Sequence, residues 1–265
     1  MFSQCSSLTT APELPATTLS RGCYNNLFRD CTNLSAAPEL PATTLAEFCY
    51  SLMFQNCIAL TSAPELPAST LAGNCYRDMF KGCTSLTEAP DLPATILGIE
   101  CYYGMFQGCT SLTEAPELPS TSLSPYCYYG MFIGCSSLVD VDDLPATTLK
   151  QGCYGYMFQG CTSLTTAPEL PASAMVRECY QGMFQNDSSL SEIKIGYTGN
   201  FGDAPLTSFQ NWVDGVAASG TFYYDGNDTT TGNSAIPTGW NVEPLTPPTN
   251  YLTFTAEEAN STVAM

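Results

Sequence analysis

Apolar positions recur with a strict period of 26 residues along the first 190 residues of the chain. Seven cysteines follow one another at this spacing from Cys5 to Cys161, and seven more from Cys23 to Cys179. Leucines from Leu8 to Leu190 and phenylalanines from Phe2 to Phe184 keep step with them. Seven periods without an insertion predict a solenoid, in which each unit buries its apolar face against its neighbours.

Each unit divides into an extended half and a half with helix-like spacing. The segment Ala-Pro-Glu-Leu-Pro, as at 115–119, is bounded by prolines and therefore predicts a short strand. In the stretch 101–109, apolar residues recur four apart at Cys101, Met105 and Cys109, which predicts a helix of two to three turns. The stacked units predict an α/β repeat, a right-handed solenoid with parallel strands on one face and short helices on the other.

The order of residues within a unit resembles a known family of repeats. The order Leu…Pro-Glu-Leu-Pro…Leu…Cys-Tyr-x-x-Met-Phe-x-Gly-Cys is similar to the BspA-like leucine-rich repeats of bacterial surface proteins. Met105-Phe106 and Cys109 stand where the family has Ala-Phe and Cys, whereas Cys101 stands where it often has Ile. The resemblance covers about residues 1–190 and implies a right-handed leucine-rich-repeat solenoid. It also implies a cell-surface or secreted adhesin that binds a host matrix or cell-surface protein.

We expect four segments along the chain. Residues 1–190 form the solenoid, which starts in mid-repeat, so a further N-terminal portion is expected before it. Residues 191–243 are predicted to form a C-terminal cap of one helix and strands, because 204–219 has helical spacing and resembles the endings that follow such repeats. Residues 244–250 read as a proline-rich linker, and 251–265 as the truncated start of a further strand-rich domain.

The fourteen cysteines have three interpretations. If each unit carries a helix, Cys101 and Cys109 lie about 12 Å apart, and packed helices lie about 8–10 Å apart, both beyond the reach of a disulfide. Zinc sites need closely spaced cysteine pairs, which the spacings of eight and eighteen residues do not supply. Cysteine also serves as a small apolar residue, so we predict that these side chains fill the core.

Composition excludes several classes of function. The chain has 25 acidic and 7 basic residues, a net charge of −18 and no histidine. Such a charge disfavours nucleic acid, and no apolar run of 18 residues is present to insert into a membrane. Without histidine or a recognisable catalytic or nucleotide-binding motif, we predict no enzyme activity, no catalytic residues, no cofactor and no dedicated metal site.

One candidate surface is acidic. The outward position of each extended half carries an acid from Glu13 to Glu169, and the middle units add more. We call the densest part the acidic ladder; it comprises Glu88, Asp91, Glu114, Glu117, Asp140, Asp142 and Asp143. Its functional interpretation is attraction of a basic protein partner, with weak binding of divalent cations as a lesser alternative. Its simpler interpretation is that the acids solvate an exposed sheet face.

A second candidate surface is aromatic. Four tyrosines depart from the regular columns: Tyr103, Tyr126, Tyr129 and Tyr156. Tyrosine suits binding surfaces because it offers a large contact area at a small cost in side-chain entropy. The sequence therefore favours a protein-binding module, against the alternatives of a passive spacer in a larger surface protein and of a phage fibre component.

Overall fold

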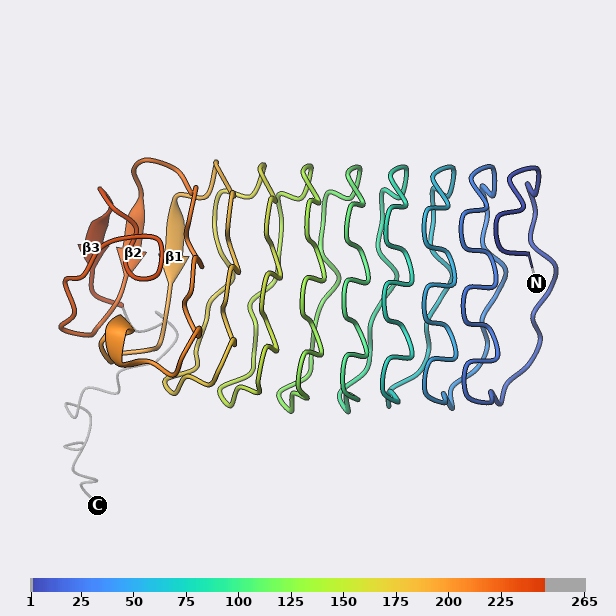
Figure 1. Cartoon of the computed structure of the whole chain (residues 1–265), viewed down its shortest axis with the longest axis horizontal. Coiled ribbons are helices and arrows are strands. Elements are labelled where there is room, and N and C mark those ends of the chain that lie inside the picture. Colours follow the sequence, from blue (N-terminus) through green and yellow to red (C-terminus); the bar gives the residue numbers. More distant parts are fainter. Residues whose placement is uncertain (1, 246–265) are drawn as a thin grey trace, which may run out of the picture.

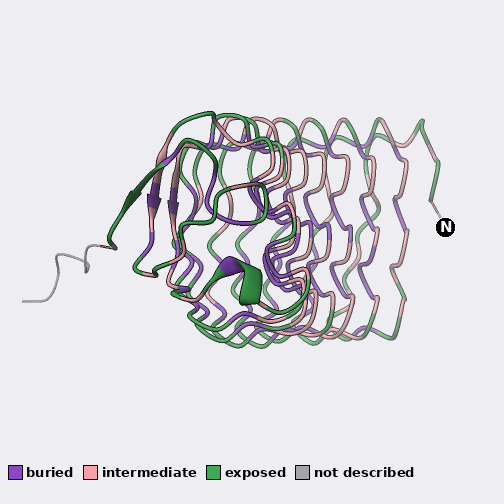
Figure 2. Cartoon of the chain, turned by 60° about the vertical axis from the view of Figure 1, so that its left-hand side comes forward, coloured by how far each residue is buried: buried purple, intermediate pink, exposed green. Residues whose placement is uncertain are grey.

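A computed structural model describes residues 2–245 of the chain. It shows a stack of similar coils, with the N-terminal coils at one end and the strands β1 to β3 at the other (Figure 1). Buried residues follow the inner side of the coils (Figure 2). The periodic sequence therefore folds as a solenoid, as predicted. Within the part that the structure describes, no helix has the length and hydrophobicity needed to cross a bilayer.

The predicted helices are wrong. The described residues contain no α-helix, and their one helical element is the 3-10 helix η1 (Phe201–Asp203). In the stretch 101–109, every second N–H bonds three residues back, as from Met105 to the Tyr102 carbonyl at 3.2 Å. The N–H groups between them reach the next coil instead, as from Phe106 to the Met131 carbonyl at 2.9 Å. The segment is thus a run of overlapping turns, bonded alternately within its coil and between coils.

Left-handed backbone conformations recur every four residues in these turns. In one coil the φ angles are 54° at Glu100, 59° at Gly104 and 75° at Gly108. The resulting chain turns two side chains inward and the next two outward, so its period is 4.0 rather than the 3.6 of a helix. A pattern of i, i+4, i+8 fits both periods over nine residues, which is why the sequence predicted a helix there. Within the segment 204–219, alternate N–H groups from Ser208 to Asp214 likewise bond three residues back, so the helix predicted for the cap is wrong for the same reason.

Proline limits the sheet on the extended side of the coils. In the repeats, the extended halves meet in isolated parallel bridges, such as Thr10 with Ala36 and Glu114 with Asp140. Proline has no N–H to donate to a ladder, and two prolines interrupt each segment except 141–145, where Asp142 stands in place of the first. A continuous parallel sheet forms only where the prolines end, in the order β1 (Glu192–Lys194), β2 (Thr221–Tyr223) and β3 (Asn241–Glu243).

Columns of identical side chains fill the interior. Phenylalanine rings stack from Phe2 to Phe184 with centroids 5.6 to 5.8 Å apart. A parallel tyrosine column runs from Tyr24 to Tyr180. Both columns end against the fully buried Trp212, which lies 6.5 Å from the Tyr180 ring and 6.2 Å from the Phe184 ring. The last coils therefore cover the apolar end of the stack.

The prediction that the cysteines fill the core is confirmed for twelve of the fourteen, which are buried as free thiols, while Cys5 is partly buried and Cys23 is exposed. The argument from helix spacing was wrong, because neighbouring coils lie about 4.8 Å apart, as in a sheet, within disulfide reach. One column is instead hydrogen bonded: the Cys109 Sγ donates to the Phe80 carbonyl at 3.2 Å. Burial raises the pKa of the Cys57 thiol to about 12 and so keeps it neutral.

The linker predicted at 244–250 lies outside the described residues except for its first two positions, and the segment 251–265 lies wholly outside them.

A glycine substitution tests the left-handed turns. Gly134 has a φ of 70°, and a Cβ added there would meet no atom within 4 Å. We expect Gly134→Ala to lower the free energy of unfolding by about 1–2 kcal/mol, because an L-residue is strained in this conformation. Gly202→Ala is the control, since Gly202 also has open space but no positive φ. Urea unfolding measures both variants, and an equal loss of unfolding free energy in the two would contradict the turn geometry.

Candidate functional site

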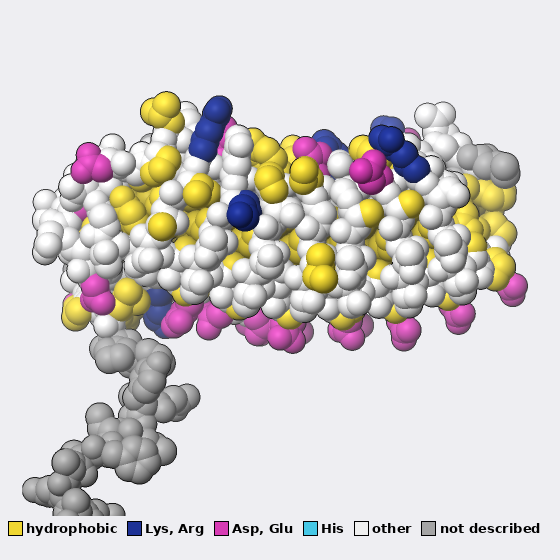
Figure 3. All heavy atoms as spheres, turned by 90° about the horizontal axis from the view of Figure 1, so that it is seen from below, with side chains coloured by type: hydrophobic (Ala, Val, Ile, Leu, Met, Phe, Trp, Pro, Cys, Tyr) yellow, Lys and Arg dark blue, Asp and Glu magenta, His cyan; other side chains and the backbone are white. Residues whose placement is uncertain are grey.

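The acidic ladder lies on the extended side of the solenoid, and all seven of its side chains are exposed. Acidic side chains form a row along one edge of the molecule, parallel to its long axis (Figure 3). The bridges Ser62–Glu88 and Glu114–Asp140 fix the register, so equivalent carboxylates stand one coil, about 4.8 Å, apart. Within residues 2–245, no Lys or Arg lies at ion-pair distance from any of the seven.

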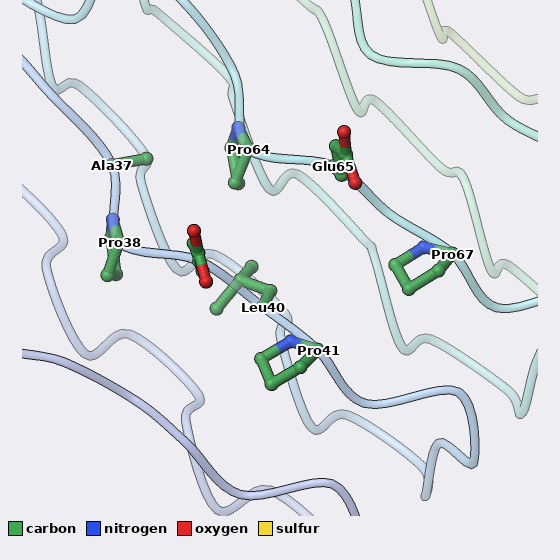
Figure 4. A pocket seen from close by; sticks show the side chains of 8 residues that line it. Ala37, Pro38, Leu40, Pro41, Pro64, Glu65 and Pro67 are labelled. Carbon is green, nitrogen blue, oxygen red and sulfur yellow. The ribbon is translucent and has the colours of Figure 1, made fainter.

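Shallow depressions lie between neighbouring coils in the N-terminal part of the acid row, by which we mean the outward acids from Glu13 to Glu169. One is lined by Pro38 and Pro41 of one coil and by Pro64 and Pro67 of the next, with Glu39 and Glu65 beside them. In Figure 4 the Glu65 side chain lies between the two prolines of its own coil. This face therefore alternates rigid apolar rings with carboxylates, and it is open rather than enclosing.

A lysine ends the acid row at its C-terminal side. The bridge between Leu170 and Ile195 places Lys194 beside Glu169, in the next coil. Its Nζ lies 3.8 Å from Glu169 and 3.3 Å from Glu192, and over the Tyr223 ring. One lysine therefore partly offsets two carboxylates at this end, whereas no Lys or Arg of the described residues pairs with the acidic ladder in the middle of the solenoid.

The structure brings the four predicted tyrosines together on the turn side. Tyr103 stacks on Tyr129 at 5.0 Å between ring centroids. Tyr126 and Tyr156 meet the Tyr129 ring edge-on, at 5.7 and 5.4 Å. All four are partly exposed, so they form one continuous aromatic patch over three coils, which we call the tyrosine cluster.

Glycines of the following coil make room for this cluster. A Cβ at Gly152 would lie 2.3 Å from the Tyr126 ring, and one at Gly182 would lie 2.4 Å from the Tyr156 ring. Each of these glycines follows its tyrosine by 26 residues. A tyrosine with a glycine one period later is thus the sequence signal of a ring lying flat on the next coil, and the sequence analysis did not use it.

Charged and polar groups border the tyrosine cluster, and sequence reasoning missed them as part of it. The Arg77 guanidinium lies 4.2 Å from the centre of the Tyr103 ring and pairs with Glu100. At the other end, the Tyr126 hydroxyl donates to Glu178 at 2.7 Å. This hydrogen bond is the largest cause that lowers the pKa of Glu178. The cluster therefore has a cation at one end and a carboxylate at the other.

No metal site is evident: among the described residues, no group of three or more His, Cys, Asp or Glu side chains is arranged to hold an ion. The acidic ladder is a row, and hard cations need several oxygen ligands around one point. What the two surfaces offer chemically is contact area and charge.

Stacked coils with a buried leucine column and parallel bridges define a leucine-rich-repeat solenoid. The chain belongs to the BspA type leucine rich repeat family, whose model matches six copies over residues 73–211, more than half of the chain. The resemblance of the repeats to this family is thereby confirmed. No curated protein and no solved structure matches the chain.

A tyrosine substitution tests the bond at the end of the tyrosine cluster. We expect Tyr126→Phe to raise the pKa of Glu178 towards its ordinary value, because the hydroxyl that stabilises the carboxylate is lost. In the unchanged protein this bond stabilises the fold above the ordinary glutamate pKa, and its contribution is lost as the pH falls through the lowered pKa. Carboxyl-detected NMR titration measures both proteins, and an unchanged Glu178 pKa would show that the bond is absent in solution.

Proposed function

We propose that this chain is a non-enzymatic protein-binding module of a bacterial cell-surface or secreted adhesin. Its family supports protein binding in general terms, because leucine-rich repeats commonly present extended faces to protein partners. The surface location and the host matrix or cell-surface partner come from the resemblance of the repeats. The observation that carries the proposal is the tyrosine cluster on the turn side.

The tyrosine cluster has the properties of a contact surface. The inward positions of the turns repeat nearly the same residues, whereas the outward position shared by Tyr103 and Tyr129 is asparagine, serine, arginine, glycine or glutamine in other coils. The rings pack on one another and on glycines, so they lose little further freedom when a partner covers them. Aromatic residues beside an arginine are typical of the residues that dominate binding energy.

The acidic ladder would act at longer range. A row of unopposed carboxylates attracts a basic partner and speeds its approach, an effect that salt screens. Because the ladder carries no enclosing groove, we assign it the role of steering and the tyrosine cluster the role of contact. Weakly bound divalent cations would compete with the basic partner for the same carboxylates.

A passive spacer remains the second candidate. The uniform stacking of the coils makes a stiff rod, and exposed acids alone keep such a rod soluble. A spacer predicts that no outward substitution changes any interaction.

Binding to a panel of host matrix proteins at low and high salt tests the proposal. One variant changes Tyr103 and Tyr129 to alanine, and its matched control changes Tyr223, a partly exposed tyrosine of β2 far along the chain. We expect the double variant to bind about tenfold or more weakly and the control to bind normally. A third variant replaces Glu88, Asp91, Glu114, Glu117, Asp140 and Asp143 by their amides.

The outcomes separate the roles of the two surfaces. The amide variant is expected to lose the salt dependence and part of the association rate while keeping the contact. Loss of binding in the amide variant alone would move the contact to the acidic ladder. Absence of binding by the folded, unsubstituted chain would reject the adhesin and leave the spacer.

A further inference from the structure

A carboxylic acid continues the cysteine column that ends at Cys161. Asp187 follows Cys161 by 26 residues and is fully buried. In the preceding coils, the cysteine at this position donates its thiol proton to a phenylalanine carbonyl 29 residues earlier, as from Cys135 to Phe106 at 3.1 Å. Asp187 therefore occupies a place where the preceding coils have a hydrogen-bond donor.

One oxygen of this carboxyl group has a partner and the other has none. Oδ1 of Asp187 accepts the Cys161 N–H at 2.8 Å, whereas Oδ2 is buried without a partner. The same N–H also donates to the Phe158 carbonyl at 2.9 Å, so the carboxyl group and this carbonyl lie side by side. Phe158 precedes Asp187 by 29 residues, and its carbonyl is the one that a cysteine at position 187 would bond.

The surroundings supply no positive charge. The thiol of Cys161 faces the carboxyl group from the preceding coil, and burial keeps the pKa of that thiol well above its ordinary value. The register of the backbone bonds places the apolar Val216 at the equivalent position of the following coil. The Asp214 carboxylate of that coil accepts a hydrogen bond from the Gln185 side chain. Within residues 2–245, no Lys or Arg forms an ion pair with Asp187.

Burial raises the pKa of Asp187 well above its ordinary value, because an ionised carboxylate loses its hydration there. The backbone N–H groups of Cys161 and Gly160 oppose this effect only in part. A neutral carboxylic acid, unlike a carboxylate, has a proton to donate.

We propose that Asp187 stays protonated in the folded protein and donates from Oδ2 to the Phe158 carbonyl, in place of the thiol of the other coils. Ionisation removes this donor and sets a carboxylate beside a carbonyl oxygen in an apolar interior, which is unfavourable. The packing between the cysteine-bearing coils and residues 188–245 is therefore sensitive to pH, and it becomes less stable as the pH rises.

The sign of the effect follows from proton binding. In the unfolded chain Asp187 loses its proton near pH 4, whereas the folded chain retains it to a higher pH. Between these two values folding takes up one proton, so the folding equilibrium constant falls about tenfold for each pH unit of increase. Below pH 4 both states are protonated and the effect is absent.

Two substitutions of Asp187 test the proposal in the whole chain. Asp187→Asn keeps the shape and supplies an amide N–H that cannot ionise, and Asp187→Cys restores the column. Asp214→Asn is the matched control, because Asp214 is acidic and close but partly exposed. Urea unfolding from pH 4 to pH 8 gives the ratio of the folding constant of the unchanged chain to that of each variant.

We expect this ratio to fall about tenfold per pH unit above pH 4 for both Asp187 variants and to stay constant for Asp214→Asn. A constant ratio for Asp187→Asn would overturn the proposal. Carboxyl-detected NMR of the unchanged chain decides independently of how the variants fold. One buried aspartate should keep the shift of a protonated acid after the exposed aspartates have ionised, and ionisation of all aspartates together would also overturn the proposal.

Discussion

The fold depends on backbone hydrogen bonds that join each coil to the next. In the turn half, alternate N–H groups donate to a carbonyl of their own coil, and those between them donate to a carbonyl of the next coil. Buried amides and carbonyls are therefore satisfied without a helix or a long strand. This alternation fixes the spacing between coils at that of a sheet. The stacked rings follow from this spacing, and an insertion within the turn half would break its bonds to both neighbours.

The sequence predicted the solenoid and its buried columns, because both depend only on the period. It failed on the turn half, where Cys101, Met105 and Cys109 fit a period of four as well as a helix. One signal that separates the two is the presence of Gly, Asn or Asp at many of the outward positions four residues apart, as at Gly104 and Gly108, where the backbone is left-handed, although Glu100 and Tyr126 share this conformation. The tyrosine cluster was predicted residue by residue, but its partners Arg77 and Glu178 were not, since their approach depends on side-chain length and on register.

The same constraint divides the molecule into parts that are fixed and parts that are free to vary. Inward positions must stack on copies of themselves, and the one replacement of a cysteine by an acid, at Asp187, leaves a buried oxygen without a partner. Outward positions meet only solvent and the next coil, so tyrosines, charges and glycines can differ between coils without disturbing the stack. A repeat of this kind can therefore carry a binding surface on one side while its core stays uniform.

The measurement that tests this account most directly is backbone NMR of the turn half in the isotopically labelled chain. We predict coupling constants that report positive φ at Glu100, Gly104 and Gly108, together with slow exchange of the Phe106 amide, which is bonded to Met131 of the next coil. Continuous helical shifts through residues 101–109 would contradict the alternating bonds. They would also require a wider spacing between coils, because packed helices lie about 8–10 Å apart.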